Sequence, residues 1–239
     1  MPEAKPKKER IQSMDALRGL AVVLMVIHHF LYDLCAFLGA PWWLFSNPVF
    51  NFLHYVFAGT FVLLAGVSSR FSRSNLKRGL IVLGIALVIT LVTTLMDMPI
   101  RFGVLHMLGF CMVFYALTHK LWESIPTPVM PILCILLLVG SALAVHLIPI
   151  RANFLWMFGW IYDGFVSTDY FPIFPWLFVF LFGTWLGKYI RERRFPGWFY
   201  SMKIPVLPVI GRHALIVYVV HQPVLYGITL VLIWLKAVF

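Results

Sequence analysis

The chain has 239 residues, of which 62% are hydrophobic and only 12% are charged. Ordinary soluble domains are roughly a quarter charged, and one of this size has no interior that could hide so much apolar surface. Lipid must therefore solvate much of the chain. The formal net charge of +10 does not indicate a nucleic-acid partner, because the Lys and Arg residues lie in short runs between apolar stretches.

Seven apolar stretches are long enough to cross a bilayer as helices, which takes about 20 residues each. The sequence therefore predicts an all-α, polytopic transmembrane helical bundle that forms a single domain over residues 1–239. The last stretch is long enough to be tilted, or to begin as a half-helix at Pro208. A broken aromatic stretch at 150–168 is expected to be re-entrant or interfacial. The expected spans are 14–38, 52–67, 79–95, 104–121, 132–148, 170–190 and 206–235.

The basic residues predict an orientation. If the N-terminus is cytoplasmic, the outside loops hold only Arg101 and Arg151. This distribution satisfies the positive-inside rule and predicts a multi-pass protein of the plasma membrane with a cytoplasmic N-terminus. Most of the remaining basic residues then lie inside, in the basic tail 1–13 and in three loops: 70–78, about 119–131 and 189–205.

Polar side chains within the spans are costly and mark function by default. Arg18 and His29 are eleven positions apart, so they share one helix face and lie about 16 Å apart along the axis. Asp33 follows His29 by one turn, where a carboxylate can orient the imidazole and leave its other nitrogen as a base. Asp15 can pair with Arg18, although both could simply end the helix at the interface. His28 faces another direction and is expected to pack.

Other polar residues lie in later spans, and each alone is more often a packing residue. Together with His29 they could line one cavity. The cysteines have neither paired nor metal-ligand spacing, and no hydrolase, P-loop or dinucleotide motif occurs. We therefore expect no metal. The polar residues are His54, Ser68, His106, His213, Tyr218, His221 and Gln222.

A series of short motifs lies in order along nearly the whole chain. They are found at 13–21, 28–33, 59–69, 76–79, 102–109, 169–176 with Gly183, 211–213 and 221–223. Together they resemble the catalytic-domain family of heparan-α-glucosaminide N-acetyltransferase, in particular its short bacterial members. This family belongs to a wider group of transmembrane acyltransferases, some of which carry Arg and His eleven positions apart on the first span.

The resemblance implies transfer of an acyl group, usually acetyl, from cytoplasmic acetyl-CoA or another acyl-CoA to an amino or hydroxyl group of a sugar or glycan. His29 would be the base or acyl relay, and Arg18 a structural or CoA-side residue. The lysosomal enzyme has its proposed catalytic histidine in the loop after the first span, where this chain has Ala40. His54 is therefore the alternative base. The candidate acyl-CoA-binding residues are Arg70, Lys77, Arg78, Ser68 and His106.

A different function class stays open at this stage. The same His, Asp and Arg side chains could form a proton path in a proton-coupled small-solute transporter without covalent chemistry. The lack of an internal repeat disfavours that alternative. The expected partners are membrane lipids, acyl-CoA and a sugar or glycan acceptor, without nucleic acid. A homodimer is also compatible with the sequence.

The orientation can be tested with single cysteines labelled from either side of intact cells. A cysteine at Ser74, in the loop 70–78, should react only with a membrane-permeant reagent, because the positive-inside rule puts it in the cytoplasm. A cysteine within 149–169 should react from outside. Labelling of position 74 by an impermeant reagent would overturn the topology.

Overall fold

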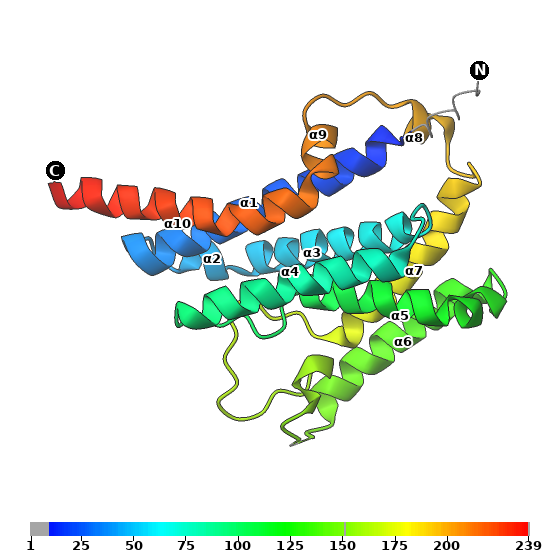
Figure 1. Ribbon diagram of the computed structural model, residues 1–239, viewed down its shortest axis with the longest axis horizontal. Coiled ribbons are helices and arrows are strands. Elements are labelled where there is room, and N and C mark those ends of the chain that lie inside the picture. The colour runs from blue at the N-terminus through cyan, green and yellow to red at the C-terminus, as the bar shows by residue number, and fades with distance from the viewer. Residues whose placement is uncertain (1–9, 151, 239) are drawn as a thin grey trace. The chain divides into compact units, whose positions relative to one another are not determined.

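The structure is a computed structural model that describes residues 10–150 and 152–238 (Figure 1). Seven of its helices are long and apolar enough to cross a membrane, which confirms the all-α class and the predicted number of spans. Within the described ranges the only extended pairing is an isolated bridge between Phe102 and Tyr170. Most of the predicted tail 1–13 lies outside the described residues, and so does Arg151.

Among the described residues, the connections between the long helices hold four small helical elements, and the two longest connections are 148–172 and 192–213. The seven long helices are α1 (Gln12–Leu38), α3 (Pro48–Ser69), α4 (Asn75–Leu95), α5 (Val104–Ser124), α6 (Val129–Leu147), α7 (Ile173–Arg191) and α10 (Ala214–Val238). The short elements are α2 (Trp43–Ser46), the 3-10 helix η1 (Leu155–Phe158), α8 (Gly197–Ser201) and α9 (Leu207–Arg212).

The observed helices differ from the predicted spans at several ends. The last stretch divides at His213 into α9 and α10, so its spanning helix begins at Ala214 and not at 206. Pro208 lies in the first turn of α9, where proline is favoured because the first turn needs no N–H bond. The aromatic stretch 150–168 contains only the four residues of η1 as helix, which is far too short to span.

The chain separates into two compact units. The first comprises residues 1–61 and 195–239, and the second residues 62–194. Within the first unit, α1 packs against α9 and α10, as Figure 1 shows. Within the second, α4 packs against α5, and α6 packs against α7. A single domain over residues 1–239 stays a prediction.

Glycines bring helix backbones into direct contact inside each unit. A Cβ atom at Gly19 of α1 would overlap the carbonyl oxygen of Leu207, and one at Gly211 of α9 would overlap the carbonyl oxygen of Asp15. Small residues of this kind replace the hydrophobic driving force that helices lose in lipid. In the second unit, Gly66 of α3 and Gly183 of α7 make the same kind of contact.

The contact between α1 and α9 predicts a clear mutational contrast. Gly211→Ala should lower thermal stability in detergent, since the added methyl meets immobile backbone and overpacking costs about 1–3 kcal/mol. The matched control is Gly227→Ala in α10, where a Cβ meets no atom within 4 Å. This control should be neutral or slightly stabilising because alanine favours helix. Equal melting temperatures for Gly211→Ala and Gly227→Ala would contradict the role given to Gly211.

Candidate active site

Four histidines from three helices gather in the first unit. The ring centroids of His28 on α1 and His54 on α3 lie 4.2 Å apart, and those of His28 and His29 lie 5.7 Å apart. His29 in turn lies 4.8 Å from His221 on α10. The two bases predicted as alternatives, His29 and His54, therefore belong to one cluster. Over residues 10–150 and 152–238, no three His, Cys, Asp or Glu side chains are placed to hold a metal ion.

His28 connects the cluster to an aromatic wall. Its ring stacks on Phe50, with centroids 5.2 Å apart and planes 8° apart, and tilts against Phe45 at 4.7 Å. Phe45 also contacts Tyr32. The expected packing role of His28 is therefore what the geometry shows, and the wall confines the cluster on that side.

The helix backbone orients His29. Its Nδ1 lies 2.9 Å from the carbonyl oxygen of Met25, one turn earlier on α1. Because a carbonyl oxygen only accepts hydrogen bonds, Nδ1 must carry the hydrogen and Nε2 must keep its lone pair. A neutral imidazole in this tautomer is suited to act as a general base. The predicted orienting group was Asp33, but the carbonyl of Met25 takes this place.

Asp33 instead connects α1 to α10. Its side chain is fully buried, and its two carboxylate oxygens lie 3.2 and 3.3 Å from Nε2 of Gln222. Gln222 directly follows His221, so this contact fixes the rotation of α10 beside the cluster. The carboxyl group also lies one turn from His29 on α1.

The other end of α1 carries a charged network. Nη1 of Arg18 lies 2.9 Å from Oδ1 of the buried Asp15, which confirms the predicted pair. Oδ2 of Asp15 lies 3.5 Å from Nε of Arg10 and 3.6 Å from Nε of Arg212 on α9. The network reinforces the glycine contact between α1 and α9. It gives Arg18 a structural setting, about 16 Å along the helix from His29.

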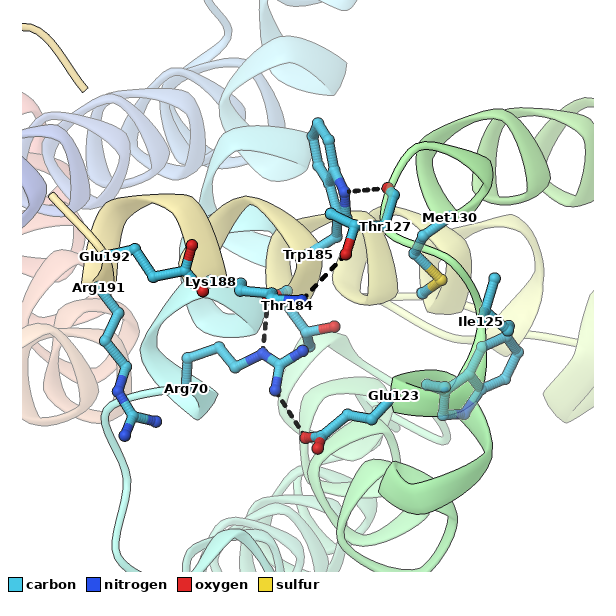
Figure 2. Close-up of a pocket in the computed structure, with 11 residues that line it drawn as sticks. Arg70, Glu123, Ile125, Thr127, Met130, Thr184, Trp185, Lys188, Arg191 and Glu192 are labelled. Carbon is cyan, nitrogen blue, oxygen red and sulfur yellow. Dashed lines mark hydrogen bonds and ion pairs between the residues drawn. The ribbon is translucent and has the colours of Figure 1, made fainter. Parts of the chain in front are cut away.

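The second unit contains a pocket of about 360 Å³, shown in Figure 2. Nε of Arg70 donates to the carbonyl of Thr184 at 2.9 Å, and its Nη1 lies 2.7 Å from Oε1 of Glu123. Nζ of Lys188 donates to Oγ1 of Thr127 at 3.0 Å. The pocket is lined by Arg70, Trp122, Glu123, Ile125, Thr127, Met130, Thr184, Trp185, Lys188, Arg191 and Glu192.

The lining combines charge with flat apolar surface. Arg70, Lys188 and Arg191 supply three cationic side chains against the carboxylates of Glu123 and Glu192, and two tryptophans add indole rings. This composition suits an anionic ligand that also carries an aromatic ring. The sequence analysis used Arg191 for membrane topology alone and placed Lys188 inside a span, so neither of these pocket residues was among the predicted acyl-CoA-binding residues.

The other predicted acyl-CoA residues do not line this pocket. Lys77 and Arg78 are exposed in the first turn of α4. Oγ of Ser68 donates to the carbonyl of Leu64 in its own helix at 2.6 Å.

His106 has both ring nitrogens engaged at the start of α5. Its Nδ1 accepts from the N–H of Gly103 at 3.3 Å, and its Nε2 lies 3.1 Å from Oγ1 of Thr90. This geometry caps the helix and ties it to α4, which is a structural role.

Comparison with known proteins identifies the family. The sequence model described as heparan-alpha-glucosaminide N-acetyltransferase, catalytic, matches residues 10–223. The chain belongs to this family. It is therefore a multi-pass membrane protein of an acetyltransferase family, as its motifs predicted. No curated protein and no solved structure matches the chain.

The match to the N-acetyltransferase family model covers both the histidine cluster and the pocket. It begins at the described start of the chain and ends just after Gln222. The part of α10 that follows residue 223 lies beyond it. All the residues discussed as a candidate site therefore fall within the catalytic region that defines the family.

Proposed function

We propose that the protein transfers an acetyl group from acetyl-CoA to an amino or hydroxyl group of a sugar or glycan at the membrane. Family membership supports the reaction class. The observation that carries the assignment of the base is the hydrogen bond from Nδ1 of His29 to Met25, which leaves Nε2 as a proton acceptor inside a polar cluster. His54, stacked on His28, remains the alternative base.

The proposed step needs one base, which takes up one proton and releases it again within the turnover. Nε2 of His29 takes the proton from the acceptor N–H or O–H as that nitrogen or oxygen attacks the thioester carbonyl carbon. The new C–N or C–O bond forms, and the C–S bond breaks. The thiolate that leaves then takes the proton from the imidazolium, so coenzyme A departs as a thiol and His29 returns to its neutral form.

The pocket of the second unit is the proposed site for the nucleotide end of the donor. Arg70, Lys188 and Arg191 would make charge-assisted hydrogen bonds to its phosphates, and Trp122 and Trp185 offer faces for adenine. The pocket is built where α3, α5 and α7 end and α6 begins. In the predicted topology these ends all face the cytoplasm, where acyl-CoA is available.

The cellular setting also belongs to this proposal. We expect the N-terminus to be cytoplasmic, the membrane to be the plasma membrane, and the acceptor to be reached at the membrane. A homodimer stays a prediction. The transporter alternative gains no specific support from the geometry, and solute uptake into liposomes without acetyl-CoA is the result that would revive it.

Charge removal in the pocket should weaken donor binding. In Lys188→Ala/Arg191→Ala, KM for acetyl-CoA should rise about tenfold, equivalent to about 1.4 kcal/mol, with kcat nearly unchanged because the lost contacts bind donor and transition state alike. The matched control is Lys77→Ala/Arg78→Ala, which removes the same number of charges outside the pocket. A larger KM increase in the control would place the donor site at the start of α4 instead.

Histidine substitutions should separate the candidate bases. His29→Gln should reduce transfer of radiolabelled acetyl from acetyl-CoA by about 10²–10⁴-fold, the usual loss of a general base. His28→Gln should be milder because its ring packs against aromatic side chains. Size-exclusion profiles and melting in detergent would confirm that each variant is folded. If His54→Gln alone abolished transfer, the base would lie on α3, and activity in all three variants would refute the mechanism.

A further inference from the structure

His221 on α10 is a second imidazole with one uncommitted nitrogen. The side chain is buried, and its Nδ1 lies 2.5 Å from the carbonyl oxygen of Tyr218. As for His29, this contact requires the hydrogen on Nδ1 and leaves the lone pair on Nε2. Nε2 is itself buried and has no hydrogen-bond partner among the described residues. Such an atom costs free energy and calls for a functional explanation.

The placement of His221 against His29 offers that explanation. Their ring centroids lie 4.8 Å apart with the planes at 79°. Rings at this spacing are in contact, and rotation of one side chain about its χ angles can bring the two Nε2 atoms to the roughly 3 Å of an N–H···N hydrogen bond. In the neutral state both Nε2 atoms are acceptors and have nothing to donate. Once either ring takes a proton, it becomes a donor and the other ring can accept.

We propose that His221 shares the catalytic proton with His29; the catalytic part of this inference rests on the proposed function. The proton leaves the acceptor N–H or O–H for Nε2 of His29, which then donates to Nε2 of His221. It finally passes to the departing thiolate, so neither imidazole keeps a charge after turnover. Sharing spreads the positive charge over two rings in surroundings where an isolated cation is costly.

Neighbouring groups fit this arrangement. The side chain of Asp33 lies one turn from His29, and its contact with Gln222 holds α10 in register. On α1 and α3, His28 and His54 are the remaining titratable groups of the cluster. On α9, which also packs against α10, Arg212 is directed to Asp15. Gln222 therefore acts as a positioning residue and His221 as the proton partner.

Kinetic measurements would test whether His29 and His221 share the proton. The assay uses labelled acetyl-CoA as donor and glucosamine as the probe acceptor. His221→Gln keeps a hydrogen-bond acceptor but cannot hold the proton, so kcat should fall about 10–100-fold with KM for acetyl-CoA unchanged. The rate in H₂O/D₂O mixtures should curve with deuterium content in the wild type, where two protons move, and be linear in the variant. The matched control is His213→Gln, an exposed histidine. A wild-type kcat and a curved dependence in His221→Gln would overturn the proposal.

A second measurement requires no transfer activity. In wild-type protein labelled with ¹⁵N-histidine in lipid nanodiscs, the Nε2 signals of His29 and His221 should change in the same steps during a pH titration. In His221→Gln the step of His29 should move. Independent titration of the two rings in the wild type would refute the pair. Shared steps in a protein that transfers no acetyl group would instead refute the proposed function and leave the proton pair standing.

Discussion

A protein in lipid must satisfy its polar groups internally, because the hydrocarbon core offers them no hydrogen bonds. Here most polar side chains do so within their own helix: His29 bonds to the carbonyl of Met25, Thr60 to that of Val56, and Ser68 to that of Leu64. Only a few buried atoms are left without a partner in the part of the chain described, among them Nε2 of His221 and Oε1 of Gln222. His221 and Gln222 are neighbours on α10 and contact His29 and Asp33 of α1, so this part of the unsatisfied polarity lies where chemistry is proposed. Other such atoms, among them Oγ of Ser72 and Oγ1 of Thr229, lie elsewhere.

The two halves of α1 consequently differ in what they do. Near its start, the carboxylate of Asp15 and the backbone contact at Gly19 hold the helix against α9. About three turns later, His29 lies beside α10, where the bond between Asp33 and Gln222 is one polar link between the two helices. Because the rigid contact is made by backbone atoms at one end, the other end can carry partly unsatisfied side chains without losing its alignment.

The sequence was sufficient to predict the seven apolar helices and to single out His29 as a candidate, because apolar length and helical spacing are properties of nearby residues. The sequence could not predict that Asp33 contacts Gln222, because Gln222 lies 189 positions away and no periodicity relates the two residues. The carbonyl that orients His29 belongs to the backbone and leaves no trace in residue type. Lys188 and Arg191 fit the positive-inside rule as well as the proposed binding role, so composition alone cannot separate these two explanations.

Helix length differs between the units. With 27 and 25 residues, α1 and α10 are about 40 and 37 Å long, whereas the 19 residues of α6 and of α7 give about 28 Å. A hydrocarbon core of about 30 Å accommodates the shorter pair nearly upright and requires the longer pair to tilt or to extend into the headgroups. Hydrophobic mismatch therefore acts mainly on α1 and α10, the helices that carry His29 and His221. The thickness of the surrounding bilayer thereby becomes a physical variable that sets how His29 and His221 are presented to each other.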